Sequence, residues 1–349
     1  MKHDHEQSTK LRVGILFGGK SAEHEISVLS AKNVIAALDV DRFEAVLIGI
    51  DAQGGWHRLS DPDMLDGAPV RPNHLDLDLL TGIDVAFPIL HGPLGEDGTL
   101  QGLLELAGIP YVGCGVMSSA ANMDKDIAKR LLRAAGIAVA DWITVAAVDR
   151  PTIDVAATVQ ALGLPLFVKP ADMGSSIGVS KVERQEDLLH AIDDAFQYDR
   201  KILIEKAIVG DEVECAVLGN ESPKAARLGR IIPKANFYTY EAKYQDEDNT
   251  VLEIPANIPD DVARSVQALA LQAYKVMGCE GMSRVDTFVT PEGEVIINEI
   301  NTIPGFTRFS MYPQMWEASG ISYTDLITQL LLLAIDRAEQ RRKLRTTHT

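Results

Sequence analysis

Residues 283–301 read SRVDTFVTPEGEVIINEIN, two apolar and polar runs around a turn, and this stretch decides how the chain folds. A two-residue turn at 292–293, which glycine favours, predicts a β-hairpin. Its register places Asp286 opposite Glu299 and Arg284 opposite Asn301. Because side chains alternate along a strand, these four polar residues share one face. The other face is expected to carry the core residues Val285, Val289, Ile296 and Ile300.

The opposed carboxylates indicate a cation site. Two carboxylates facing each other across a hairpin repel and destabilise a bare sheet, and a bound divalent cation removes that repulsion. Oxygen ligands from Asp286 and Glu299, with the Asn301 amide nearby, suit Mg²⁺ shared with nucleotide phosphates. A solvated acidic hairpin is the alternative. The following NTIPGF (301–306) favours the metal, because Gly305 would supply backbone N–H groups beside the same face.

Upstream, PLFVKPADMGSSIGVSKV (165–182) predicts two strands around a loop of small residues. Lys169 ends the first strand and the loop spans 173–178. Backbone N–H groups exposed in such a loop bind phosphate oxygens, and the lysine adds positive charge. The loop is not a Walker A motif, because GxxxxGK[ST] is absent and a strand follows. Taken alone, it is better explained as an ordinary glycine-rich hairpin.

The first third of the chain alternates strands and helices, as an open parallel sheet with crossover helices does. Apolar runs predict strands at 11–17, 44–50, 83–89 and 109–113. Two segments follow strand ends, where ligand sites of α/β proteins gather: GGKSAEHEIS (18–27), with Glu23, and HGPLGEDGTLQG (91–102), with His91. Alone, Glu23 is better explained as a helix-dipole partner and His91 as a loop hydrogen-bonder.

Near residue 115 the pattern changes to helices and pairs of strands. Residues 122–135 predict a helix with Ile127, Leu131 and Ala135 along one face. Further strands are expected at 165–182, 201–208 and 213–219, and a second amphipathic helix at 261–277. A polar and aromatic segment between Ile232 and Pro259 lacks periodicity, which is typical of a lid.

Composition narrows the class of protein. The 349 residues carry 33 Lys+Arg against 50 Asp+Glu, a formal charge of −17. This charge opposes binding to nucleic acid or to an anionic membrane, so an anionic ligand needs a locally basic pocket. Three scattered cysteines without CxxC suit a reducing compartment. The start, MKHDHEQSTK, lacks the apolar core of a signal peptide, and no apolar stretch is long enough for a bilayer span, so a cytoplasmic location is expected.

Together these segments resemble the D-alanine–D-alanine ligase family of the ATP-grasp superfamily. The similarity runs in order through FGGKSAEHEIS, HGPLGEDGTLQG, MDKDIAKRLL, FVKPADMGSSIGVSKV, IEKAIVGDEVECAVLG, FYTYEAKY, RVDTFV, NEINTIPGFT and SMYP. It implies an α/β protein with a Rossmann-like parallel-sheet domain (1–115) and two α+β ATP-grasp subdomains (116–206 and 207–349), the second with a lid loop at 233–259.

The resemblance also implies roles for residues at the amino-acid substrates. Glu23 would bind the ammonium of the first D-alanine, with His91 close by. Ser175 and Tyr244 would hydrogen-bond with Glu23 and link the lid to the N-terminal domain. The remaining residues implied at the reacting atoms and at the second D-alanine are Arg284, the Gly305 backbone, Ser310, Met311 and Lys243.

For ATP and metal the implied residues fall into three groups. Lys125 and Lys169 would meet the phosphates. Two Mg²⁺ or Mn²⁺ ions would be held by Asp286, Glu299 and Asn301. The residues implied along the rest of the nucleotide are Ser176, Glu205, Ala207, Ile208, Glu212 and Asn298. Two departures from the family pattern stand out, Ala207 in place of a common tryptophan and His24 in place of a common arginine.

The implied activity is ATP-dependent joining of two D-alanines through an acyl phosphate, for peptidoglycan precursors, by an enzyme expected to be a homodimer. A D-alanine–D-lactate ligase is the nearest alternative, and Tyr244 in EAKY argues against it. A nicotinamide oxidoreductase would need the GxGxxG fingerprint, which is missing after the first strand. A non-catalytic nucleotide sensor should lack the full set of metal ligands, which is present here.

Overall fold

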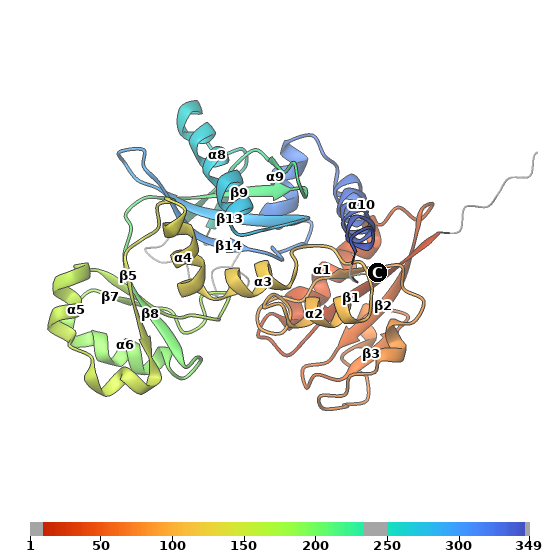
Figure 1. Ribbon diagram of the computed structural model, residues 1–349, viewed down its shortest axis with the longest axis horizontal. Coiled ribbons are helices and arrows are strands. Elements are labelled where there is room, and N and C mark those ends of the chain that lie inside the picture. Colours follow the sequence, from red (N-terminus) through yellow and green to blue (C-terminus); the bar gives the residue numbers. More distant parts are fainter. Residues whose placement is uncertain (1–9, 234–249, 346–349) are drawn as a thin grey trace, which may run out of the picture.

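The computed structural model describes residues 10–233 and 250–345, and within these residues the strands form three separate sheets (Figure 1). The first sheet has the order β3-β2-β1-β4, and its elements are β1 (Leu11–Gly18), α1 (His24–Ala37), β2 (Phe43–Ile50), β3 (Trp56–Leu59), β4 (Val85–Pro88) and α2 (Thr99–Leu106). Two short 3₁₀ helices, Pro62–Met64 and Leu77–Leu80, lie between β3 and β4. The fully buried Val13, Ile15 and Phe17 explain why β1 reads as a continuous apolar run.

Two details of the predicted N-terminal sheet are wrong. The strands β1, β2 and β4 are parallel as expected, but the edge strand β3 runs antiparallel to β2, so the sheet is mixed. The chain reverses there because Asp51 accepts backbone hydrogen bonds from Gln53 and Gly55 and closes a tight turn. Residues 109–113 form only an isolated bridge between Tyr111 and Ala86, since the neighbouring Pro110 has no N–H to extend a ladder.

The second sheet lies in the green lobe of Figure 1 and is antiparallel, with the order β5-β8-β6-β7. Its elements are β5 (Trp142–Ala146), a 3₁₀ helix (Ala147–Thr152), α5 (Val155–Leu162), β6 (Leu166–Pro170), β7 (Ser180–Val182), a 3₁₀ helix (Gln185–Asp187), α6 (Leu188–Ala195) and β8 (Lys201–Lys206). Its apolar side chains, among them Val168, Ile192 and Ile204, form a core of their own. This unit therefore has a buried core separate from those of the other two sheets.

The third sheet has the antiparallel order β12-β11-β9-β13-β14, with β10 paired to β9. Its elements are β9 (Asp211–Leu218), β10 (Lys224–Ala225), β11 (Gly229–Pro233), β12 (Thr250–Glu253), α8 (Asp260–Val276), β13 (Met282–Val289), β14 (Val295–Asn301), α9 (Met311–Ala318) and α10 (Tyr323–Arg342). The expected loop at 233–259 is too long, because 250–253 form β12 beside β11. Each sheet falls inside one of the ranges 1–115, 116–206 and 207–349, which we propose as domain boundaries.

The predicted hairpin register is confirmed where it matters and wrong near the turn. Arg284 pairs with Asn301 and Asp286 with Glu299. The turn, however, is a three-residue loop at 291–293 closed by a hydrogen bond from the Gly293 N–H to the Thr290 carbonyl. The extra loop residue is offset by a bulge at Asn298, so Ile297 is buried in the core and Ile296 is only half-buried.

The helix predicted at 122–135 is split and rotated. Asp124 caps α4 (Lys125–Ala134) and separates it from α3 (Val116–Met123). The predicted apolar face is exposed, with Ile127 at 40% and Leu131 at 42% exposure. The buried residues are Asp126, Ala128, Lys129 and Leu132. Polar partners, rather than the apolar stripe, orient this helix.

The N-terminal and C-terminal units share one core. A single buried cluster contains Phe17, Phe87, Phe306 and residues of α9 and α10. The rings of Phe87 and Phe306 meet edge to face, with centroids 5.4 Å apart. Within the described residues no single helix is long and apolar enough to cross a membrane. Among these residues, only α9 and α10 taken together reach that length and apolar content, and the angle between them is 105°.

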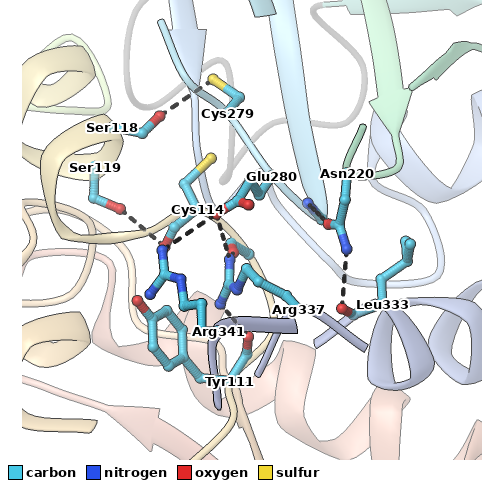
Figure 2. A network of polar contacts seen from close by, with 12 residues as sticks. Tyr111, Cys114, Ser118, Ser119, Asn220, Cys279, Glu280, Leu333, Arg337 and Arg341 are labelled. Atoms are coloured by element: carbon cyan, nitrogen blue, oxygen red, sulfur yellow. Dashed lines mark hydrogen bonds and ion pairs between the residues drawn. The ribbon is translucent and has the colours of Figure 1, made fainter. Parts of the chain in front are cut away.

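Buried Arg337 of α10 ties the same two units together through polar contacts (Figure 2). Its guanidinium donates to the carbonyls of Gly113 and Tyr111 and lies 3.4 Å from Glu280. Arg341, one turn later and half exposed, pairs with Glu105 at 2.6 Å. Both carbonyls belong to the last residues of the N-terminal unit. Arg337 therefore fixes the segment through which the chain passes from this unit to the next.

We expect Arg337→Met to lower the free energy of unfolding by about 2–4 kcal/mol, because it leaves two buried carbonyl oxygens without a hydrogen-bond donor. Arg341→Met is the matched control and should cost no more than about 1 kcal/mol, since its partner is solvent-accessible. Thermal or urea denaturation measures both. Equal losses in the two variants would contradict the role given to Arg337.

Candidate functional site

The polar face of the hairpin lies where the three units meet. Asp286 is flanked on its neighbouring strands by Glu299 of β14 and Glu214 of β9. Half-buried Arg284 binds Asp286 with both nitrogens of its guanidinium fork, at 2.7 and 2.6 Å, and approaches Glu214 at 3.1 Å. Burial alone would lower the pKa of Arg284, but Asp286 and Glu214 raise it well above its usual value. The site therefore holds a permanent cation among three carboxylates.

The donor set predicted for metal suits a hard divalent cation. Asp286, Glu299 and Asn301 lie on one face, and the Asn301 amide donates to Asp286 at 2.9 Å. Carboxylate and amide oxygens are the ligands that Mg²⁺ and Mn²⁺ prefer. In the described part of the chain, no group of three or more His, Cys, Asp or Glu side chains is already arranged around one point as a metal site. The Arg284 guanidinium supplies the positive charge next to Asp286.

The glycine-rich loop adjoins this face. Lys125, the first residue of α4, donates to the Met173 carbonyl of the loop at 2.6 Å and lies 3.7 Å from Glu299. Ser175 and Ser176 both adopt left-handed backbone angles, with φ of 52° and 58°. Such angles are uncommon outside glycine and mark strained, functional loops. The structure thus brings Lys125, the predicted phosphate loop and the metal face together.

Predicted nucleotide residues gather at the end of β8. Lys169 of β6 lies 2.7 Å from Glu205, and both side chains are buried. Ala207 and Ile208 follow β8 and form part of the link to the third sheet, where Glu212 is the second residue of β9. The backbone N–H of Ala207 donates to Pro165, so the link is held to the central unit. Asn298 sits at the bulge of β14.

Glu23 and His91 come from the N-terminal unit. Glu23 precedes α1 and is 8% exposed, and its carboxylate does not cap that helix. A Cβ built on Gly174 of the phosphate loop would lie 3.4 Å from its Oε2, so Glu23 faces the loop carrying Ser175. His91 bonds through Nδ1 to the Ile303 carbonyl, which leaves its buried Nε2 as an acceptor without a partner. Burial lowers the pKa of His91, keeping it neutral.

Ser310 and Gly305 form the C-terminal edge of the site. Ser310 precedes α9, and its Oγ lies 2.7 Å from the hydroxyl of Thr307. A Cβ built on Gly305 would lie 3.1 Å from Ser310 Oγ, so a side chain at this position would crowd the Ser310 hydroxyl. The side chain of Met311 is buried in the core against Gly229, so only its backbone at the start of α9 can face a ligand. Lys243 and Tyr244 lie outside the described residues.

Three site residues were not predicted from the sequence. Glu214 lies beside Asp286, and the alternation of β9 could have indicated it. Lys129 contacts Glu205 at 2.5 Å from inside α4, where periodicity indicated the opposite face. Glu96, in HGPLGEDG, accepts hydrogen bonds from the N–H groups of Gly92 and Ile303 and so joins the first and third units. Contacts so distant in sequence leave no local signal.

Glu96 makes stability depend on pH. Burial, reinforced by Glu23, raises its pKa from 4.5 to about 8. Between these values the folded state keeps a proton that the unfolded state has released, so the stabilisation falls as pH rises through this window. We expect Glu96→Gln to lack this loss. Melting temperatures from pH 5 to 8 measure it, with Asp97→Asn as control for the change in net charge, and parallel pH curves for the parent and Glu96→Gln would refute the assignment.

Comparison with known proteins identifies the family. The model described as D-ala D-ala ligase N-terminus matches residues 12–114, and that described as D-ala D-ala ligase C-terminus matches residues 131–332. A D-alanine–D-alanine ligase of Shouchella clausii is 52% identical, covering 97% of this chain and 98% of the relative. The ligase A of Escherichia coli is 50% identical, with 97% and 99% covered.

Solved structures agree. A D-alanine–D-alanine ligase from Coxiella burnetii superposes with a TM-score of 0.83 at 39% identity, covering 96% of both chains. A D-Ala:D-Ser ligase from Enterococcus faecalis gives a TM-score of 0.82 at 36% identity, covering 93% of this chain and 99% of its own. The order of motifs, the three-unit architecture and these similarities lead to one conclusion: the chain belongs to the D-alanine–D-alanine ligase family of ATP-grasp enzymes.

Proposed function

We propose that this enzyme joins two molecules of D-alanine at the expense of ATP, for peptidoglycan precursor synthesis, at the junction of its three units. The observation that carries the proposal is the meeting of the phosphate loop with the acidic face of the hairpin. Lys125 touches both, through Met173 and Glu299. A nucleotide phosphate bound by the loop would thus lie beside the residues suited to divalent cations.

The first half-reaction activates a carboxylate. A carboxylate oxygen of the first D-alanine attacks the γ-phosphorus of ATP, the bond to ADP breaks, and D-alanyl phosphate forms. Lys125 and Lys169 oppose the repulsion between the two anions by binding phosphate oxygens. Asp286, Glu299 and Asn301 would hold Mg²⁺ or Mn²⁺, whose charge neutralises the phosphates when it is bound. Acidic Glu23 and the Nε2 acceptor of His91 suit the substrate ammonium.

The second half-reaction forms the peptide bond. The free amine of the second D-alanine attacks the acyl phosphate carbon, inorganic phosphate leaves, and the amine loses a proton. Arg284 and the backbone N–H of Gly305 would stabilise the oxyanion, as the family resemblance implies, because a fixed cation and a backbone donor both oppose negative charge. Ser310, at the start of α9, suits the carboxylate of the second substrate. The roles of Tyr244 and Lys243, and a lid within 233–259, stay predictions from the resemblance.

The second substrate needs its own test, since a D-Ala:D-Ser ligase has nearly the same fold. Phosphate release from ATP is measured with D-alanine, L-alanine, and D-alanine plus D-serine or D-lactate. We expect turnover with D-alanine alone and none with L-alanine. Isotopic labelling then identifies the product of each mixture. A mixed product in excess of D-alanyl-D-alanine at equal concentrations would overturn the proposed specificity.

The cytoplasmic location and the homodimer remain predictions. Light scattering would measure the oligomeric state.

The two amino-acid sites should fail differently when mutated. Glu23→Gln removes a charge-assisted contact worth about 1.5–3 kcal/mol, one to two decades in binding, and should suppress acyl phosphate formation. Ser310→Ala should spare that step and weaken the second substrate. Trapping the acyl phosphate with hydroxylamine separates the two steps. Equal loss of the trapped product in both variants would refute the two-site assignment.

The metal assignment predicts a sharper loss. Glu299→Gln keeps the size of the side chain but removes a charged ligand, so turnover should fall by about two decades or more while the melting temperature stays close to that of the parent. Glu294→Gln, an exposed residue directly before the same strand, is the matched control. Near-parental turnover of Glu299→Gln at ordinary Mg²⁺ would remove Glu299 from the metal site.

A further inference from the structure

Lys129 is a buried cation that the steps above do not use. Its side chain is 2% exposed, on α4 beside the strands β5 and β8 (Figure 1). The ammonium lies 2.5 Å from one carboxylate oxygen of Glu205, while Lys169 lies 2.7 Å from the other. It is also 3.4 Å from the Ala140 carbonyl and 5.5 Å from the centre of the Trp142 ring.

Two buried lysines on one carboxylate are more than a structural ion pair requires. One lysine would neutralise Glu205, and a second adds desolvation cost and repulsion between the cations. Burial, together with Lys169, lowers the pKa of Lys129 to about 8 despite the attraction of Glu205. The two lysines lower the pKa of Glu205 against the effect of its burial, so the carboxylate stays ionised. The cluster carries one positive charge in excess.

The excess charge has a use when ATP binds. Lys169 lies one residue before the end of β6 and is the lysine expected at the phosphates, so on ATP binding it would turn from Glu205 toward them. Without Lys129 this exchange would leave a carboxylate that is 4% exposed with no cation, which is strongly unfavourable. With Lys129 in place, Glu205 keeps a partner throughout. Lys125, one turn earlier on α4, has the different partners Met173 and Glu299.

We propose that Lys129 is a positioning residue of the nucleotide site, which holds the Glu205 carboxylate and so frees Lys169 for the phosphates of ATP. This inference rests on the proposed ATP-dependent function and adds a residue to it. Lys129 acts through Glu205 and does not itself touch the nucleotide. The simpler role, a staple that only fixes α4 to β8, predicts loss of stability without a selective effect on phosphate binding.

The test compares ATP with adenosine, which lacks phosphates, by calorimetric titration of the full chain with Mg²⁺ present. Lys129→Met should weaken ATP by about tenfold or more and adenosine by less than about threefold, since Lys169 stays on Glu205. Lys129→Arg keeps the charge and should restore most of the ATP affinity. In steady state the KM for ATP should rise more than kcat falls. Lys181→Met, a surface lysine of the same unit, controls for lost positive charge.

A double variant should reverse the loss of ATP affinity that the single variant causes. Adding Glu205→Gln to Lys129→Met removes the charge that retains Lys169, so the double variant should bind ATP more tightly, relative to adenosine, than Lys129→Met alone. If Lys129→Met does not fold, the comparison is made within the Glu205→Gln background. There Lys129→Met should change ATP affinity by less than about threefold, because nothing is left for it to act through.

Three results would overturn the proposal. The first is parallel weakening of ATP and adenosine by Lys129→Met, and the second is unchanged affinity for both with a lower melting temperature. The third is failure of either comparison with Glu205→Gln, namely a double variant no better than the single one or a large effect of Lys129→Met in that background. A parent protein that binds no ATP would overturn the proposed function as well, whereas each of these three leaves that function standing.

Discussion

The repulsion among Glu214, Asp286 and Glu299 is the constraint around which the rest of the site is organised. Three adjacent strands place these carboxylates side by side, and a sheet tolerates this only with cations present. Arg284 supplies one from the same face, and Lys125 approaches Glu299 from α4. The side chains that reduce the repulsion between the carboxylates, Arg284 and Lys125, are cations that also suit phosphate. In a chain of net charge −17, this arrangement makes an anion site possible.

The sequence was sufficient for the contacts that a local pattern determines. The pairing of Asp286 with Glu299 follows from the alternation of two strands around a short turn, and it is correct although the turn was wrong. Two errors cancelled there: the loop has one residue more than expected, and the bulge at Asn298 takes up the difference. On the opposite face of the hairpin the two errors do not cancel, so the buried residue is Ile297 and not the predicted Ile296. A bulge has no signature in the pattern of apolar residues.

Contacts between distant segments could not be predicted in this way. The periodicity of α4 indicated Ile127 and Leu131 as buried, yet Lys129 is the residue that points inward, because Glu205 lies 76 positions later in the chain. Glu96 likewise meets Ile303, 207 positions later in the chain. In α4, a polar partner supplied by the tertiary fold outweighs the apolar stripe. The family resemblance assigned roles to residues that the pattern alone left ambiguous, such as Glu23.

The hydrogen bond from His91 to the Ile303 carbonyl has a stereochemical consequence. It leaves Nε2 of the buried imidazole with a lone pair, which under the proposed function would accept a hydrogen bond from the substrate ammonium, together with Glu23. Under the same proposal, the carboxylate of that substrate would point toward the γ-phosphate of ATP. An α-amino acid held by its ammonium and its carboxylate, with Cα kept on one side of the line between them, has only two directions left at Cα. The methyl group and the hydrogen must then occupy the two remaining directions, and they exchange places between enantiomers. One wall against the wrong direction is therefore enough to read chirality, and an achiral amino acid such as glycine would meet no such wall.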